Sequence, residues 1–254
     1  MKIMKMMIKN NNNSLMSFSE HFYELRKRII FCLIFFFIST IFSYFFIEQI
    51  YNFLLQPFIK ISQNFNRRII YTSPSEAFIT YLKLSFYSGI FFSLPIFITQ
   101  IYFFLSPALY KNEKKNVVIF FFGAFFLFLF GAIFSYFFIL PITLEFFSSF
   151  EIHDSNANDN FKILLETKIS EYLNFVLNLI FGFGIAFQSP LLLIFLIKTG
   201  CLSINDLRKK RKYWIVIIFI VSAILTPPDL LSQISLAILL ILFFEIVILI
   251  GKNF

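Results

Sequence analysis

Long runs of apolar residues alternate with short charged segments along most of this chain. A helix that spans a membrane needs about 20 consecutive, mostly apolar residues. Four uncharged stretches meet that requirement, at residues 29–47, 84–105, 116–140 and 172–197. We therefore predict four membrane-spanning helices in these places.

The apolar region 213–250 needs a different interpretation, because two prolines and an aspartate interrupt it at "TPPD". One helix of this length would reach about 57 Å at 1.5 Å per residue, against a hydrocarbon core of about 30 Å. Pro227 removes a backbone donor, Pro228 restrains the residue before it, and Asp229 is unfavourable at the lipid midplane. We predict a turn at the membrane surface between two short spans, 213–226 and 231–250.

The predicted fold is thus an all-α integral membrane protein with six transmembrane helices. Residues 1–16 are basic and polar, and we interpret them as a disordered tail before the membrane domain, residues 17–254. The fifth span is too short to cross an unperturbed bilayer upright, so it must thin the lipid or be sheltered by its neighbours. This favours a bundle with a concave or thin side.

Composition agrees with a membrane protein. The 254 residues are 59% hydrophobic and only 14% charged, and 42 of them are phenylalanine. Soluble domains usually carry roughly a quarter charged residues. The class of soluble globular proteins is therefore excluded.

Lysine and arginine set the predicted orientation, because they accumulate in cytoplasmic loops. Sixteen of them lie in the segments on the side of the two termini, and five lie in the segments on the other side. Lys83, at the end of a span, is counted on neither side. We expect both termini on the cytosolic side, or on the matrix or stromal side in an organelle.

The segment "SFSEHFYELRKRII" before the first span contains the first candidate for binding chemistry. Its apolar and polar side chains fall on two helical faces, which predicts a short amphipathic helix on the membrane surface that bends into the first span. The apolar face holds Phe18, Phe22, Leu25 and Ile29, and the polar face holds His21, Glu24 and Arg28. In the alternative interpretation, Glu24 only pairs with Arg28 four residues later.

A second acid lies in "LSPALYKNEKKN", between the second and third spans. Glu113 is the only acid of this loop and is surrounded by lysines, so a solvated charge cluster is the alternative interpretation. Glu24 and Glu113 nevertheless lie on the same side of the membrane. Together they could bind a dication, and a pair of guanidinium groups is the natural ligand, since arginine offers a planar fork to a carboxylate.

Two polar residues inside spans are further candidates, because ionisable or polar groups in the membrane are often functional. Gln188 precedes Pro190, so its side chain could instead satisfy backbone groups that the proline frees. Glu245 could instead lie near the cytosolic interface as a snorkelling acid.

Other chemistry finds little support in the sequence. Cys32 and Cys201 have no metal-ligand spacing, and the two histidines, His21 and His153, argue against a bis-imidazole haem. No nucleotide-binding loop or hydrolase motif is present. We predict no cofactor, no metal, no enzyme activity and no nucleic-acid partner.

Five segments in order resemble the signature segments of the TatC family, the signal-peptide receptors of the twin-arginine protein translocase. They are "HFYELRKRII", "FLSPALYKNEKK", "FGFGIAFQSP", "INDLRKKRKYWIVI" and "AILTPPDLLSQISLAILL" with the later "FEI". The resemblance implies a cupped bundle of six spans with both termini on the cytosolic side. It implies binding of twin-arginine signal peptides on folded precursors, and transport driven by the proton-motive force.

The resemblance also implies partners and a location. Single-span TatA- and TatB-type subunits, further copies of the same chain and membrane lipid are the expected partners. The membrane would be a bacterial inner membrane, a mitochondrial inner membrane or a plastid thylakoid membrane. A small-solute or ion transporter of another family is the alternative, and a quinone- or electron-transfer subunit is a third.

The resemblance also assigns roles to individual residues, through the motif in which each one lies. Glu24, Arg26 and Glu113 match the residues that line the twin-arginine site. Pro57, Asp229 and Gln233 match family positions on the opposite side, Gln188 matches a position that is glutamate or glutamine, and Glu245 matches the acid of the last span. Many members have arginines where this chain has Lys114 and Lys115, and lysine lacks the bidentate fork.

Overall fold

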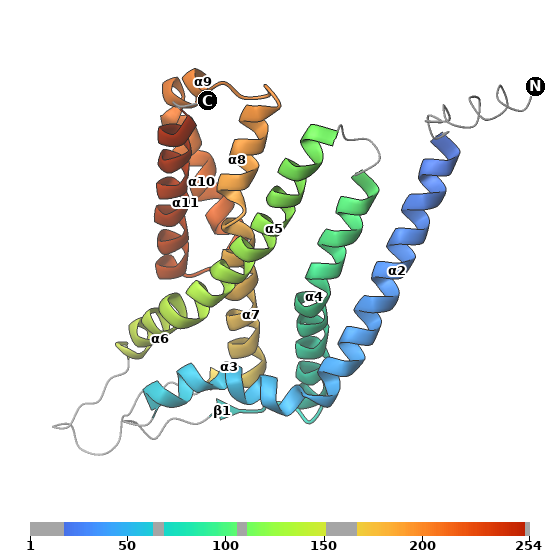
Figure 1. Ribbon diagram of the computed structural model, residues 1–254. Coiled ribbons are helices and arrows are strands. Elements are labelled where there is room, and N and C mark those ends of the chain that lie inside the picture. The colour runs from blue at the N-terminus through green and yellow to red at the C-terminus, as the bar shows by residue number, and fades with distance from the viewer. Residues whose placement is uncertain (1–17, 63–68, 106–110, 151–166, 252–254) are drawn as a thin grey trace, which may run out of the picture.

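The computed structural model describes residues 18–62, 69–105, 111–150 and 167–251, which form a bundle of helices around one apolar core (Figure 1). The long helices are α2 (Phe18–Phe45), α4 (Glu76–Leu105), α5 (Lys111–Phe134), α7 (Ile169–Ala186) and α11 (Leu230–Ile250). The shorter ones are α3 (Ile47–Ser62), α6 (Leu140–Ser148), α8 (Ser189–Lys198), α9 (Ile204–Lys209) and α10 (Arg211–Leu225). A π-helical turn, η2 (Ser135–Ile139), joins α5 to α6, and β1 (Ile69–Ile70) pairs in parallel with β2 (Thr167–Lys168).

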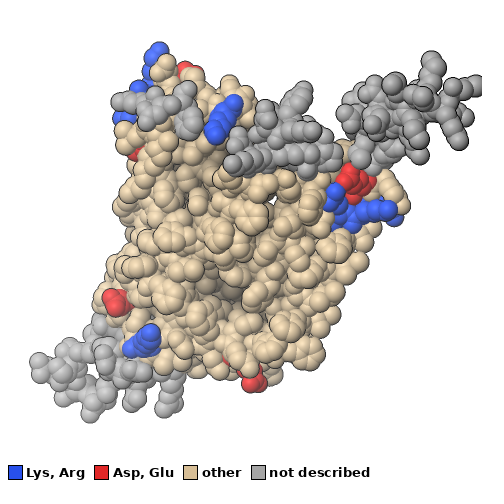
Figure 2. Space-filling model, in the orientation of Figure 1, with Lys and Arg blue, Asp and Glu red and all other residues tan. Residues whose placement is uncertain are grey.

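The helices run alternately up and down between two ends of the molecule (Figure 1). The terminal face is the end where α2 begins and α11 ends, and it also holds α9. The opposite face is the end where α3 and the two short strands lie. Acidic and basic side chains gather near these two ends, while other residues cover the band between them (Figure 2). This distribution suits a molecule embedded in a bilayer.

The prediction of six spanning helices is confirmed. Five segments are long and apolar enough to cross a membrane: His21–Phe45, Glu76–Phe104, Val117–Ser148, Ile169–Lys198 and Leu230–Ile250. The sixth is α10, whose 15 residues reach only about 22 Å at 1.5 Å per residue. The third span continues through η2 and α6, and the fourth consists of α7 and α8 with a break at residues 187–188.

The prediction of a separate surface helix before the first span is wrong. Helix α2 is continuous from Phe18 to Phe45, without a bend into the membrane. The polar face that includes Glu24 is turned toward α4, whereas Phe22 and Ile29 are exposed. In a membrane the surroundings are apolar, so a polar stripe belongs against a neighbouring helix and the apolar stripe belongs toward lipid.

Helix α3 lies across the opposite face and was not predicted (Figure 1). Pro57 lies inside this helix and has no N–H, so the carbonyl of Phe53 lacks its usual donor four residues later. The hydroxyl of Tyr136 donates to that carbonyl at 2.5 Å, and the hydroxyl of Tyr172 donates to the next carbonyl, of Leu54, at 2.9 Å. The proline therefore frees an acceptor by which the bundle holds α3.

The "TPPD" segment forms the predicted turn between α10 and α11, which lies toward the opposite face but short of the end that α3 occupies (Figure 1). Helix α10 ends at Leu225, and the Thr226 hydroxyl donates to the Ser222 carbonyl at 2.8 Å. Asp229 is the N-cap of α11, because its carboxylate accepts from the Ser232 backbone N–H at 2.8 Å and from the Ser232 hydroxyl. The aspartate thus satisfies donors at the start of the last span.

Small residues allow two pairs of helices to approach closely. A Cβ added at Gly89 would lie 2.9 Å from the Thr40 Cα, so α4 touches the backbone of α2 there. A Cβ added at Gly131 would lie 2.7 Å from the Phe183 carbonyl oxygen, where α5 meets α7. Without a hydrophobic driving force between helices in lipid, such contacts stabilise the bundle through van der Waals packing.

We expect Gly89→Ala to destabilise the protein by about 1–3 kcal/mol, because the methyl group overpacks the contact between α2 and α4. The measurement is thermal unfolding of the detergent-solubilised protein. Gly123→Ala is the matched control, because its Cβ would meet only a Leu191 methyl group at 3.8 Å. Equal melting temperatures of the two variants would contradict the close contact.

We expect Asp229→Ala to cost about 0.5–2 kcal/mol of stability through the loss of the N-cap of α11. Asp229→Asn should retain most of the stability, since asparagine caps helices about as well as aspartate. The same unfolding assay distinguishes the two variants. If both lose the same stability, the negative charge of Asp229 matters and capping does not explain it.

Candidate functional site

Glu24 and Arg28 form the most extensive polar cluster near the terminal face. Both Nε and Nη2 of Arg28 donate to Oε1 of Glu24, the Nε bond at 3.1 Å. Arg28 also donates to Oε1 of Gln100 and to the carbonyl oxygen of Phe103, each at 3.2 Å. The guanidinium carbon lies 5.9 Å from the Phe103 ring centroid. Arg28 therefore fixes the Glu24 carboxylate to the end of α4.

The second oxygen of the same carboxylate has no such partner. Oε2 of Glu24 is buried and accepts no hydrogen bond within the part of the chain that the structure describes. An ionised carboxylate offers about four acceptor positions, and Arg28 uses only those of Oε1. Oε2 thus has unused acceptor capacity among the described residues, and a guanidinium group reaches it once the groups that cover this oxygen move aside.

The other residues at this end of α2 extend the cluster. His21 stacks on Phe104 with ring centroids 4.2 Å apart, which is a second contact between α2 and α4. Arg26 is exposed beside the cluster. The i,i+4 pairing of Glu24 with Arg28 is confirmed, and its extension to α4 is what the sequence could not indicate.

Glu113 lies in the first turn of α5, directly after the connection from α4. Its side chain, and those of Lys114 and Lys115, lie outside the described part of the structure. The backbone alone places Glu113 on the terminal face, the same end of the molecule as Glu24 (Figure 1). Their joint site stays a prediction.

Gln188 lies at the break between α7 and α8. Its Nε2 donates to the carbonyl oxygen of Ala124 in α5 at 2.7 Å. The alternative interpretation, in which Gln188 satisfies backbone groups freed by Pro190, does not describe this contact, because the side chain bonds a neighbouring helix. The residue links the third span to the fourth.

Glu245 lies one turn and a half from the end of α11 and pairs with Arg211 at the start of α10. The distance from Nη2 of Arg211 to Oε2 of Glu245 is 3.0 Å, and both side chains are more than a third exposed. This position near the terminal face agrees with the interfacial alternative for Glu245, which stays a prediction. Such an exposed pair contributes little to stability.

The three remaining candidates lie away from the terminal face. Pro57 is buried in α3 and Asp229 caps α11, as described above. The Gln233 side chain is half-buried, and the structure gives it only a backbone bond to the Asp229 carbonyl, at 3.2 Å. The structure does not bring these residues to the Glu24 cluster.

Glu76 at the start of α4 is an important residue that the sequence did not single out. Its carboxylate accepts from the N–H and the hydroxyl of Thr72, at 2.6 and 3.0 Å. It also accepts from the N–H and the hydroxyl of Ser170, at 3.3 and 2.5 Å. The sequence held one indication of this residue, because Glu76 follows "TSPS" directly and an acid is favourable in the first turn of a helix. Glu76 joins α4 to α7 beside the two strands.

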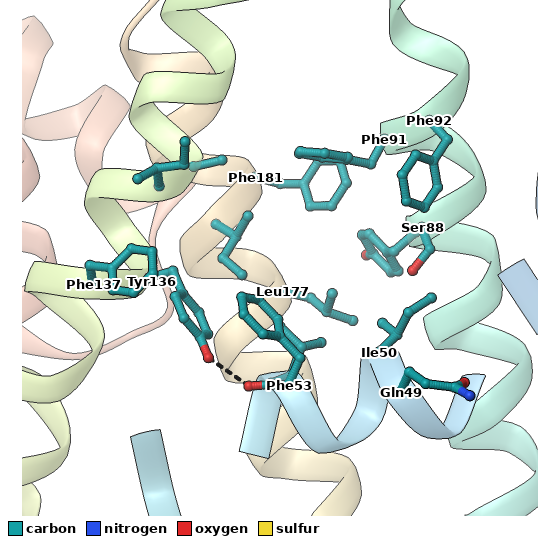
Figure 3. Close-up of a pocket in the computed structure, with 15 residues that line it drawn as sticks. Gln49, Ile50, Phe53, Ser88, Phe91, Phe92, Tyr136, Phe137, Leu177 and Phe181 are labelled. Atoms are coloured by element: carbon teal, nitrogen blue, oxygen red, sulfur yellow. Dashed lines mark hydrogen bonds between the residues drawn. The ribbon is translucent and has the colours of Figure 1, made fainter. Parts of the chain in front are cut away.

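The bundle is hollowed on the side seen in Figure 2. A cavity of about 390 Å³ opens between α3, α4, α7 and the π-helical turn, and nearly all of its lining is apolar. Phe53, Phe91, Tyr136 and Phe181 point toward it from four different elements (Figure 3). The bundle therefore has a concave side, but α10, the short span from which a concave side was predicted, does not line it.

Comparison with known proteins gives the family. Residues 20–238 match the family described as Sec-independent protein translocase protein (TatC). A TatC protein of Rickettsia prowazekii (strain Madrid E) is 44% identical over 231 residues, which cover 91% of this chain and 90% of the relative. An uncharacterised tatC-like protein, ymf16, of Reclinomonas americana is 42% identical over 226 residues, 89% of this chain and 84% of the relative.

A solved structure agrees with these relatives. The crystal structure of a twin-arginine translocase receptor, TatC, in the detergent DDM superposes with a TM-score of 0.73 at 34% identity. The match covers 91% of this chain and 99% of that chain. The relatives do not favour the transporter alternative, and their family is a membrane translocase component rather than an enzyme. With its six spans and its near full-length match, this chain belongs to the TatC family of the Sec-independent protein translocase.

Proposed function

We propose that this chain is the subunit of the translocase that receives twin-arginine signal peptides of folded precursor proteins. Glu24 and Glu113 bind the two guanidinium groups of the signal, and Arg26 lies beside them. The observation that carries the proposal is the Glu24 carboxylate, which has one oxygen fixed by Arg28 and one oxygen with spare acceptor capacity. A rigidly held carboxylate loses little entropy when a guanidinium group binds.

The path of the chain supports a joint site. Arg28 ties Glu24 to Gln100 and Phe103, near the end of α4, and the chain reaches Glu113 in α5 ten residues after Phe103. Both acids thus belong to helix ends at the terminal face, on the two helices that flank α4 (Figure 1). Two carboxylates at the same end of the bundle suit a ligand with two neighbouring arginines.

Orientation follows from the distribution of basic residues. The terminal face carries the lysines and arginines that the positive-inside rule assigns to the cytosol, or to the matrix or stroma of an organelle. Precursors that await transport are in that compartment, so the proposed site faces them. The opposite face, with α3 and the "TPPD" turn, then lies in the receiving compartment.

The hollow side and the short span α10 suit the recruitment of partners. A concave apolar flank leaves helix surfaces that another transmembrane helix can cover. We propose that single-span TatA- and TatB-type subunits and further copies of this chain assemble there, and that the proton-motive force drives transport.

The orientation predicts the outcome of a topology experiment. A reporter fused after Phe254 should lie on the cytosolic side, and a reporter inserted near Asn156 should lie on the opposite side. Protease or cysteine accessibility in intact vesicles measures both positions. Reporters that both lie on one side would contradict the six-span orientation.

Loss of either acid should weaken binding of the signal. A charge-assisted hydrogen bond contributes roughly 1.5–3 kcal/mol, and water and salt at the surface reduce this toward the lower end. We therefore expect Glu24→Gln and Glu113→Gln each to reduce crosslinking of a twin-arginine signal about tenfold. A twin-lysine signal, which lacks the planar fork, should show a smaller effect.

The control variant is Glu48→Gln, because Glu48 is an exposed acid at the start of α3, on the opposite face. It should crosslink the signal as the unchanged protein does. Equal crosslinking by Glu24→Gln, Glu113→Gln and Glu48→Gln would remove the basis for the proposed site.

A further inference from the structure

Lys83 is a cation at a position where the chain otherwise becomes uncharged. It directly precedes the uncharged stretch 84–105 and lies two turns into α4, on the side of the opposite face. Its Nζ donates to Oδ1 of Asn174 in α7 at 2.9 Å. No acidic side chain of the described residues forms an ion pair with Lys83. The Lys83 side chain is exposed, and its ammonium group keeps two further donors and a positive charge that an external anion can engage.

A polar cavity surrounds this lysine. It has a volume of about 290 Å³ and is lined by residues of the segment before α4, of α4 and of α7. Its polar lining consists of Thr72, Ser73, Glu76, Thr80, Lys83, Ser170 and Asn174. Glu76 is an acid in the same cavity, but four donors of Thr72 and Ser170 already occupy its oxygens. Lys83 is thus the charged group of this cavity that a ligand can still engage.

The apolar hollow of Figure 3 adjoins the polar cavity along the groove between α4 and α7. Leu177 lines both cavities. On α4, Tyr87 and Phe91 line the hollow one and two turns after Lys83, or about 6 and 12 Å further along the helix. The groove therefore presents a cation near the membrane surface and an apolar cavity deeper in the bilayer.

Hydrocarbon is the natural filling of an open apolar cavity at this depth. The bilayer core supplies no water, and the lining gives water almost no polar partners. A volume of about 390 Å³ falls in the usual range of small-molecule sites. A ligand with an acyl chain and an anionic group matches both halves of the groove.

We propose that the groove between α4 and α7 binds an anionic phospholipid from the leaflet at the opposite face. The phosphate group accepts from the Lys83 ammonium group in the polar cavity, and one acyl chain lies in the hollow between Phe53, Phe91 and Phe181. An anionic lipid compensates the lysine charge. The positively charged group of a choline or ethanolamine headgroup finds no acidic partner in this cavity, because hydrogen bonds already occupy the Glu76 oxygens.

The site can be tested by native mass spectrometry of the full chain, purified in mild detergent and titrated with phosphatidylglycerol or phosphatidylcholine. The unchanged protein should bind phosphatidylglycerol about tenfold more tightly. Lys83→Gln should lose that preference. Lys60→Gln is the matched control and should retain it, because Lys60 lies exposed in α3 and lines neither cavity.

A second variant tests the apolar half of the groove. Ser88 lines the hollow, and its replacement by leucine would fill part of it. Ser88→Leu should weaken binding of both lipids while the chain remains folded, as monodisperse gel filtration would show. If Lys83→Gln and Lys60→Gln bind phosphatidylglycerol equally, or if the unchanged protein does not distinguish the two lipids, the headgroup site is overturned. Failure of the unchanged protein to retain lipid would overturn the whole proposal and favour a partner helix as the occupant.

Discussion

The absence of water inside a bilayer is the constraint on which this structure depends. Each polar group at that depth is expected to find its partner within the protein, and most of the observed contacts follow this rule, with Ser43, Ser135 and Ser189 as exceptions among the described residues. Gln188 bonds a carbonyl of the neighbouring span, and Tyr136 supplies the donor that Pro57 withholds from Phe53. The serine and threonine hydroxyls of the spans mostly donate to carbonyls three or four residues earlier in their own helix, as Thr40 and Ser85 do. Gln188 and Tyr136 thereby form contacts between helices, and phenylalanines such as Phe42 and Phe130 are exposed on the outside of the bundle.

The two ends of the bundle are joined by different contacts. On the opposite face, α3, the paired strands and the Glu76 carboxylate connect segments from both halves of the chain. Among the described residues of the terminal face, Arg28 and the stacking of His21 on Phe104 join the first span to α4. The Glu24 oxygen without a described partner lies at this face, and the proposed signal-peptide site rests on it.

The hollow side follows from the choice of residues at the helix contacts. Gly131 and Gly184 let α5 and α7 approach closely, since a Cβ at either position would clash with the other helix. The π-helical turn then directs Tyr136 toward α3, and bulky aromatic rings hold α4 away from the third span around the cavity. The close contact between α5 and α7 and the bulky aromatic rings between α4 and the third span together produce the concave bundle.

Much of this architecture was accessible from the sequence. Hydropathy and the length of a bilayer determined the spans, and "TPPD" determined the turn between the last two, because these features depend only on local composition and backbone chemistry. The i,i+4 pair of Glu24 and Arg28 was accessible for the same reason. Tertiary structure alone decided that this pair is anchored to α4, that α2 continues straight into the membrane, and that Gln188 bonds α5. It also decided that Glu76 joins α4 to α7 and that Lys83 meets Asn174. These contacts join residues far apart in the chain, and no local pattern encodes which helix faces which. In addition, a polar stripe on a helix in an apolar solvent marks a buried face and not an exposed one, which is the reverse of the pattern in water.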